Sequence, residues 1–418
     1  MKILYPPFLL LSIRFRNFVC FILFLFFTSP VLAQQVPFQY NFRDHLLYRN
    51  HAYFDIPYSN SLMANSLLLE KDTIAAYHYV ERALNAGAFY NMFNSKTFAA
   101  VKDMFMQKHN LTIDEWVNNA QLKLSDPKTL HVETGDIDLF WQVFDKLHHK
   151  NAGEIFMNDY LLKGSKGLQT FFLVRWSGNI HNYINTLKQH ENFYRSIRPL
   201  YNNINEKMQT VYTAANKLKD LYPPSFFPPI YLMVGMMTAG GTPDGGAGLL
   251  IGTEFYSMSN TTDTTGLGAW ERSVIKSNEY LVPIIIHEYV HIQQKIPQSS
   301  TVLAKVINEG SADFITQLIS GKNINEHIHA YGNKREKELF EKFEKEKDGT
   351  DLSYWLHNGA EALKRGIPAD LGYYLGYKIV ESYYNKAADK KQAVKDILEI
   401  KDFDDFYKRS GYSAKFNN

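Results

Sequence analysis

The stretch of this 418-residue chain that decides its fold runs from Ile284 to Gln294 and reads Ile-Ile-Ile-His-Glu-Tyr-Val-His-Ile-Gln-Gln. Asn278 can cap a helix here, Pro283 is tolerated in its first turn, and Pro297 ends it. Because this helix is apolar on nearly all sides, the sequence predicts that it is buried.

Two histidines in this helix, His287 and His291, are four residues apart. A helix places them one turn apart on one face, so both imidazoles can reach a single ion. Glu288 is offset from this pair, and in zinc hydrolases a glutamate at this position takes the proton of the metal-bound water. Such a motif arises by chance in about a few per cent of chains this rich in histidine. The alternative is two satisfied core histidines, but burying them with a carboxylate and no partner would be costly.

A third ligand is available in the next predicted helix, which Ser300 or Thr301 can start and Gly321 can end. Glu309 lies in the middle of this helix, and the small residues 310–312 allow it to approach the first helix closely. Asp313 is one turn beyond Glu309, on the same face, where it can accept the outer N–H of a ligand histidine. Read alone, the two acids could equally be surface residues.

Together, the residues His287-Glu288-x-x-His291 and Glu309-x-x-x-Asp313 resemble the gluzincin division of zinc metallopeptidases. More closely, residues 287–294 and 309–313 resemble a group of uncharacterised, exported bacterial proteins that are predicted zinc-dependent proteases. Residues 368–380 are similar to a segment of that group and of gliding-motility lipoprotein relatives. The chain departs from these patterns in lacking a lipid-attachment cysteine and anything like a calcium-binding lobe. The resemblance implies one Zn²⁺ held by the two histidines and Glu309, with Glu288 as general base.

The resemblance also implies a mostly α, α+β fold, with a small mixed sheet above the metal helices and substrate along its edge strand. The apolar run Gly248–Tyr256 fits that edge, and an extended peptide could add to it through main-chain hydrogen bonds. Glu254 could then meet a substrate amine, or could equally be a solvent-facing strand residue. The glycine-rich residues 238–248 predict a hairpin or an exposed loop rather than a phosphate site.

The residue that stabilises an oxyanion is not identified by the sequence. The possible donors are Tyr331, Tyr373, Tyr374 and Tyr377, but with 27 tyrosines in the chain each is better explained singly as a packing residue. The pairs His148–His149 and His327/His329 are expected to be exposed helix-end or loop residues rather than ligands.

The chain before this region reads as helical from residue 40 to about 220. Asp72 is a predicted N-cap, and Thr112 with Glu115 forms a capping box. Four prolines between residues 221 and 229 break the pattern, after which it becomes strand-like. We therefore expect a helical N-terminal domain at 34–222 and a gluzincin-like metallopeptidase domain at 223–418.

Residues 1–33 have the pattern of a cleaved signal peptide. Basic residues precede the apolar run Phe18–Phe27, and small residues 31–33 end it. The alternative, an uncleaved anchor, is disfavoured because ten residues fall short of the ~20 that a spanning helix needs. We expect an exported protein, periplasmic or extracellular, with no stable membrane span. Its only cysteine, Cys20, leaves with the signal, so a metal in the mature chain must sit on His, Asp or Glu.

The charge balance, 45 basic against 43 acidic residues, argues against a nucleic-acid partner, because phosphate binding needs clustered Lys and Arg. The leading hypothesis is a zinc peptidase that acts on a peptide or protein substrate. Two alternatives stay open: a non-proteolytic envelope binding or assembly protein that keeps the metal fold, and a zinc hydrolase of a non-peptide amide. The oligomeric state cannot be inferred.

Overall fold

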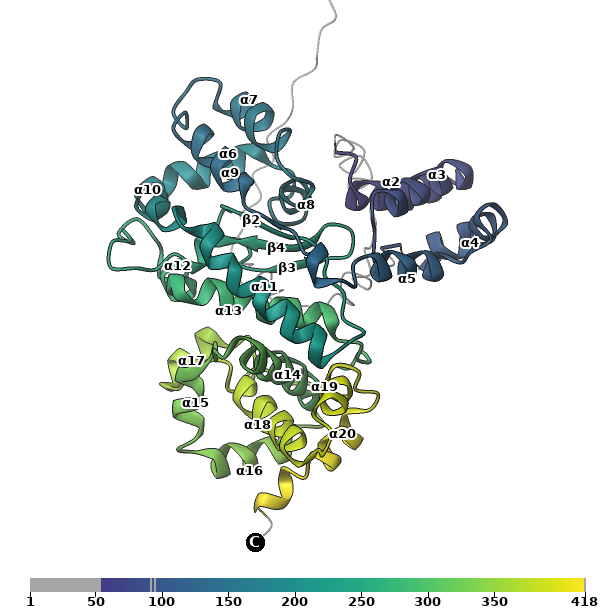
Figure 1. Cartoon of the computed structure of the whole chain (residues 1–418). Coiled ribbons are helices and arrows are strands. Elements are labelled where there is room, and N and C mark those ends of the chain that lie inside the picture. The colour runs from purple at the N-terminus through teal and green to yellow at the C-terminus, as the bar shows by residue number, and fades with distance from the viewer. Residues whose placement is uncertain (1–53, 91, 94, 417–418) are drawn as a thin grey trace, which may run out of the picture.

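The computed structural model describes residues 54–416, apart from 91 and 94 (Figure 1). The predicted signal peptide and Cys20 lie outside the described residues. The chain is mostly helical with one small mixed four-stranded sheet, which confirms the predicted fold class. Within the described part, no helix is long and apolar enough to cross a bilayer.

Four helices, α2 (Pro57–Leu69), α3 (Thr73–Asn85), α4 (Ser95–His109) and α5 (Ile113–Lys123), stand to one side of the molecule (Figure 1). Asp72 caps α3 by accepting from the Ala75 N–H at 3.0 Å, and Thr112 and Glu115 form both bonds of the capping box, so these predictions are confirmed. Most of the buried apolar side chains of this unit form clusters of their own. The Tyr90 hydroxyl links the unit to the rest by donating to the Ile292 carbonyl at 2.6 Å.

The next helices cover the sheet from above in Figure 1, and α6 and α8 contact its strands. They are α6 (Gly135–Phe144), α7 (Ala152–Phe156), the π-turn η3 (Met157–Leu161), α8 (Lys166–Arg175), α9 (Ile180–Gln189) and α10 (Glu191–Ile197). Short 3₁₀ turns η2 (Pro127–Thr129) and η4 (Arg198–Tyr201) flank them, and α11 (Ile204–Leu221) runs below the sheet. The prolines between residues 221 and 229 follow α11 and end this helical region, as predicted, and the next element is a strand.

The sheet has the order β1–β2–β4–β3, with β1 (Val132–Glu133), β2 (Ile230–Met233), β3 (Thr242–Asp244) and β4 (Gly248–Gly252). The first three in this order are parallel, and β3 pairs antiparallel with β4. One prediction is therefore wrong and another is confirmed. The run 248–256 is not an edge strand, since β4 lies between β2 and β3, and the chain then turns into the 3₁₀ segment η5 (Thr253–Tyr256). The hairpin at 238–248 is confirmed, but it is largely buried rather than exposed, and its first strand forms the edge.

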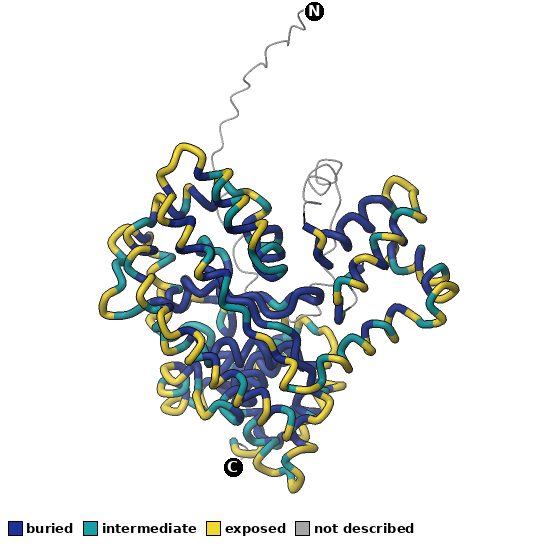
Figure 2. Tube along the Cα trace, turned by 45° about the horizontal axis from the view of Figure 1, so that its top comes forward, coloured by how far each residue is buried: buried dark blue, intermediate teal, exposed yellow. Residues whose placement is uncertain are grey.

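The domain boundary at residue 222 stays a prediction. Strand β1, which belongs to the predicted N-terminal domain, pairs with β2 of the later part, with Val132 opposite Ile230. One apolar core includes residues on both sides of this boundary, and Figure 2 shows buried segments running through the sheet into the helices below it.

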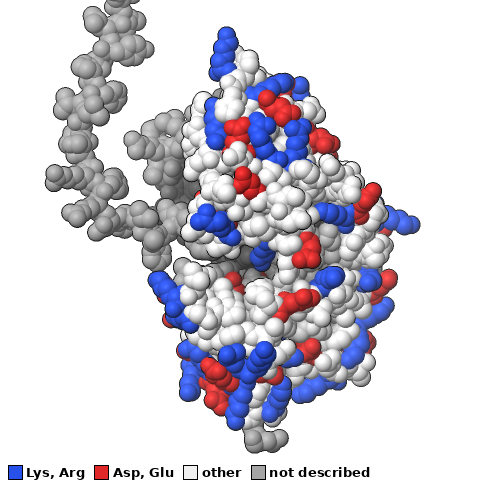
Figure 3. Space-filling view, turned by 90° about the vertical axis from the view of Figure 1, so that its left-hand side faces the viewer, with Lys and Arg blue, Asp and Glu red and all other residues white. Residues whose placement is uncertain are grey.

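The C-terminal half is helical and packs beneath the sheet (Figure 1). Its helices are α12 (Ala269–Val274), α13 (Leu281–Gln293), α14 (Val302–Ser320), α15 (Glu326–Gly332), α16 (Glu336–Glu346), α17 (Gly359–Arg365), α18 (Leu371–Lys386), α19 (Lys390–Leu398) and α20 (Phe403–Ser410), with 3₁₀ turns η6 (Asn278–Tyr280) and η7 (Ser413–Phe416). Lys, Arg, Asp and Glu side chains are interspersed over the face in Figure 3.

Three helix boundaries in this half test the sequence prediction. Thr301 caps α14 by accepting from the Ala304 N–H, and Gly321 ends it at a φ of +78°, both as predicted. Asn278 does not cap α13. It opens η6 instead, and its side-chain amide donates to the Tyr256 carbonyl at 2.9 Å.

Candidate metal centre

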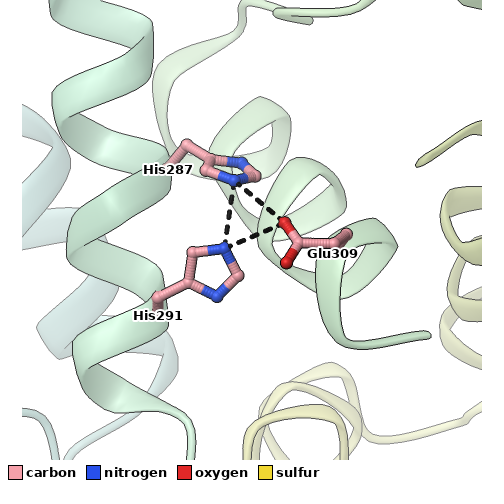
Figure 4. A group of neighbouring side chains, drawn as sticks. All are labelled: His287, His291 and Glu309. Atoms are coloured by element: carbon pink, nitrogen blue, oxygen red, sulfur yellow. Dashed lines mark hydrogen bonds and ion pairs between the residues drawn. The ribbon is translucent and has the colours of Figure 1, made fainter. Parts of the chain in front are cut away.

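Helices α13 and α14 bring two histidines and one glutamate together in the interior (Figure 4). His287 and His291 project from successive turns of α13, and their Nε2 atoms are 3.1 Å apart. Glu309 faces them from α14, with Oε2 at 3.6 Å from His287 Nε2 and 3.2 Å from His291 Nε2. All three are at most 3% exposed. The structure thus brings together the three ligands proposed from the sequence.

A close contact behind α14 fixes its position. Gly310 lies against Gly376 of α18, where an added Cβ would be 2.0 Å from the Gly376 carbonyl carbon. The prediction that residues 310–312 allow α14 to approach the metal helix is therefore only partly right. Gly310 serves the contact with α18, and Ser311 faces the end of α13, where its hydroxyl accepts from the Gln294 amide at 2.8 Å.

The outer nitrogen of each histidine has its own oxygen partner. His287 Nδ1 lies 2.8 Å from Asp313 Oδ1, and the other oxygen of Asp313 accepts from Asn325 Nδ2 at 2.6 Å. His291 Nδ1 lies 2.7 Å from Gln294 Oε1. Both carboxylate and amide oxygens accept, so each Nδ1 is placed to donate to its oxygen partner, and with a metal ion bound each Nε2 would offer its lone pair to the ion.

Gln294 was not singled out from the sequence. Its amide donates to the Asn308 carbonyl at 2.9 Å and to the Ser311 hydroxyl, which leaves its oxygen to accept from His291. The signal that could have found it is a polar side chain three residues after the second histidine, on the same face of a buried helix.

The electrostatics of this cluster favour a cation. Burial alone would lower the pKa of His287, but the carboxylates of Asp313 and Glu309 raise it to about 10. Burial likewise works against ionisation of Glu309, yet the two histidines hold its pKa well below the usual range. The carboxylates therefore create a negative potential at the two Nε2 atoms.

The three residues fit a zinc ion. Two imidazole nitrogens and one carboxylate oxygen, all within 4.8 Å of one another, are a donor set that zinc takes in sites with an open fourth position. Glu288 is 1% exposed, and its Oε1 has no hydrogen-bond partner among the described residues. A buried polar atom without a partner is costly and calls for a functional explanation.

Comparison with known families agrees with this geometry. Residues 271–402 match the model of a family described as "Predicted Zn-dependent protease (DUF2268)". This third of the chain is similar to predicted zinc proteases. No curated protein and no solved structure gave a match.

All five candidate residues and all four candidate tyrosines lie within this protease-like segment, and one of the tyrosines reaches the cluster. The Tyr373 hydroxyl contacts Glu309, and its ring centroid is 6.0 Å from that of His287. Burial raises the pKa of Tyr373, so the hydroxyl keeps its proton and can donate it.

The other tyrosines have different partners. Tyr374 donates to Asn333, Tyr331 lies under Arg335, and Tyr377 packs against Phe314. The remaining histidines lie outside the cluster: those at 148, 149 and 327 are exposed, and the one at 329 is half-buried beside Tyr374 and Tyr377 rather than exposed.

The structure contradicts both interpretations of Glu254. It is neither solvent-facing nor on the strand edge, because it lies in η5 and is fully buried. Its two oxygens accept from the N–H groups of Gly235 at 2.7 Å and Met237 at 3.0 Å. Burial raises the pKa of Glu254 to about 7 although these bonds oppose the rise. Its role is to hold the chain segment that follows β2.

Proposed function

We propose that this protein is an exported zinc metallopeptidase of the gluzincin type. The observation that carries the proposal is the buried cluster of His287, His291 and Glu309 with the unpartnered Oε1 of Glu288 beside it. The similarity of residues 271–402 to predicted zinc proteases supports the same reaction class. Export rests on the signal-peptide pattern of residues 1–33 alone.

The two histidines and Glu309 would hold the ion, and Asp313 and Gln294 fix the ring orientations that this requires. Zinc in such a site acidifies water and polarises a substrate carbonyl. Burial raises the pKa of Glu288, which makes its Oε1 a stronger base once ionised. In the proposed reaction this atom accepts the proton of the attacking water and returns it to the leaving amine. Tyr373 is the tyrosine placed to donate a hydrogen bond at the cluster.

The test is the substitution Glu288→Gln, which keeps the shape of the side chain and removes the base. Zinc content, measured by elemental analysis, should stay near one per chain, and cleavage of an unstructured peptide library should slow by ~10²–10⁴. The matched control is Glu279→Gln, because Glu279 is exposed and lies on the turn before α13. If Glu288→Gln loses its zinc while activity per bound metal is unchanged, the residue is structural and the peptidase proposal fails.

One observation favours a second candidate, a non-proteolytic binding or assembly protein of the envelope. Each residue of the cluster is nearly inaccessible, with His287 and Glu288 only 1% exposed. A polypeptide substrate therefore needs a movement of the surrounding chain before it can reach Glu288. Zinc content does not separate the two functions, but peptide turnover does.

A further inference from the structure

Arg175 is the last residue of α8, and it reaches the edge strand of the sheet. Its Nε donates to Thr242 Oγ1 at 2.8 Å, and that hydroxyl in turn donates to the Gly241 carbonyl at 2.8 Å. The guanidinium is thus anchored at the start of β3 through Nε.

This anchoring point adjoins the proposed general base. Gly241 precedes Thr242 and packs directly on Glu288, since an added Cβ would be 3.0 Å from Glu288 Cγ and 3.1 Å from its Cδ. Arg175 is also close enough for its charge to lower the pKa of Glu288 against the larger effect of burial. The guanidinium thus lies beside the edge strand, near the atom that would take the proton.

The guanidinium of Arg175 is not paired with a carboxylate in the part of the chain that the structure describes. Among the described residues it forms no ion pair, and neither Nη1 nor Nη2 makes a hydrogen bond. The Tyr58 hydroxyl and Glu288 are the groups whose charge acts on it, while burial lowers its pKa. By contrast, Arg195, Arg198 and Arg409 each pair with a carboxylate although their side chains are about half exposed.

A half-buried charge without a partner is unfavourable, and tethering α8 to β3 does not require it. A neutral amide could donate to Thr242 equally well. The unused part of the guanidinium is a planar fork, whose geometry matches a carboxylate through two parallel hydrogen bonds.

The edge strand β3 offers few main-chain hydrogen bonds to a peptide. β3 has three residues, and Pro243 in its centre has no N–H to donate. A peptide that adds to a sheet edge normally gains affinity from a row of main-chain bonds. At so short an edge, side-chain contacts must supply much of the affinity and the selectivity.

We propose that Arg175 binds a carboxylate of the peptide substrate through Nη1 and Nη2, and so selects substrates with a carboxylate close to the cleaved bond. The carboxylate is that of an Asp or Glu side chain or that of the peptide C-terminus. This inference rests on the proposed peptidase function, and it names the substrate class of the same site.

Direct binding tests it without turnover. Fluorescence anisotropy with the zinc-loaded Glu288→Gln protein should compare a pool of nine-residue peptides rich in Asp and Glu with a matched pool carrying Asn and Gln. Each pool is used with a free and with an amidated C-terminus. A charge-assisted pair predicts that the carboxylate-bearing peptides bind about 10- to 100-fold more tightly. Tighter binding of the free than of the amidated form of both pools assigns the C-terminal carboxylate, and tighter binding of the acidic pool in both forms assigns the side chains.

Three further variants in this background identify the residue. Arg175→Gln should abolish the preference while Arg175→Lys, which keeps the charge without the fork, should retain part of it. The control Arg365→Gln removes an exposed arginine on α17 and should change nothing. Zinc content and the circular dichroism spectrum verify that each variant folds. Should Arg175→Gln not fold, Thr242→Val, which removes the anchor of the guanidinium, takes its place and should weaken the preference.

The outcomes separate the two proposals. Equal binding of all four peptide preparations, no binding of any of them, or a preference that survives Arg175→Gln overturns the carboxylate proposal. If the preference depends on Arg175 but the wild-type protein cleaves no peptide, the carboxylate site stands and the peptidase function fails. If wild-type protein cleaves the acidic and the neutral pool, each with a free and with an amidated C-terminus, all equally well, the peptidase function stands and the carboxylate site fails.

Discussion

Replacing Glu254 with glutamine should change how the stability of this protein depends on pH. Glu254 is fully buried, and its pKa of about 7 in the folded state compares with an ordinary value of 4.5. Between these values the folded protein holds a proton that the unfolded chain gives up, so stability falls as pH rises through this window. The loss of stability caused by ionising Glu254 is small below pH 4.5 and complete above pH 7. From pH 5 to pH 8 it grows by about 2–3 kcal/mol.

The measurement is the difference in unfolding free energy between wild type and variant, from urea denaturation followed by tryptophan fluorescence at pH 5, 6, 7 and 8. Groups other than Glu254 titrate in both proteins and cancel in this difference. Glu254→Gln and Glu254→Leu should differ from each other by a constant, because the leucine also loses the bonds to Gly235 and Met237. The unfolding free energy of each variant, relative to that of the wild type, should nevertheless increase by the same amount as pH rises. A difference that is flat from pH 5 to pH 8, or that has the opposite sign, refutes the reasoning.

Four other outcomes are expected. Gly310→Ala places a methyl group inside the α18 backbone, so the free energy of unfolding should fall by ~3 kcal/mol or more, and an unchanged urea midpoint would contradict this packing. Glu309→Ala removes a ligand and should lower zinc affinity by more than ~100-fold in chelator competition, whereas full zinc content would exclude the assignment. Asp313→Asn should weaken zinc affinity roughly 10–100-fold in the same assay, and an unchanged affinity would deny that its contact with the histidine matters. Protein from the native host should begin at Gln34 by intact-mass measurement, and retention of the first 33 residues would disprove cleavage.

Local signals in the sequence were sufficient to predict much of the helical structure. Asp72 and Thr112 cap helices because a short polar side chain reaches the free N–H groups of the first turn, which depends only on neighbouring residues. Asn278 looked equally suitable but was captured by the Tyr256 carbonyl from another segment. A cap whose side chain has a competing long-range partner cannot be recognised from its neighbours alone.

The sheet was harder to predict for a physical reason. An apolar run such as 248–252 fits a central and an edge strand equally well, because strand order is decided by pairing between distant segments. Here a three-residue strand with a proline, Thr242–Asp244, takes the edge. Its proline and the glycines on either side of it are turn signals, and nothing local distinguishes a short strand among them from a loop.

The ligand spacing of the candidate centre was visible because α13 supplies its two histidines at a fixed helical interval. Gln294 lies at the end of the same helix, three residues after His291, and its spacing could have indicated it. Tyr373 was only one of four possible donors, and Arg175 was not indicated at all, because each reaches the centre through the packing of another helix, α18 or α8. A single tyrosine or arginine in a chain rich in polar and aromatic residues carries no positional signal of its own.

The segment that connects β2 to β3 explains how residues outside 271–402 complete the centre. Tyr183 and Tyr194 donate to the carbonyls of Val234 and Gly235, at 2.7 and 2.9 Å, and Glu254 accepts from the next N–H groups. Met237 has a φ of +59° within this segment, a conformation that a side chain of this size rarely adopts without support.

The same segment ends at Gly241, against Glu288. The position of the proposed base therefore depends on a carboxylate and two tyrosines that lie far from the protease-like part of the sequence. Because Glu254 has a pKa near 7, loss of its proton above neutral pH puts an uncompensated charge behind this segment. The support that Glu254 gives to the segment covering Glu288 is therefore strongest below neutral pH.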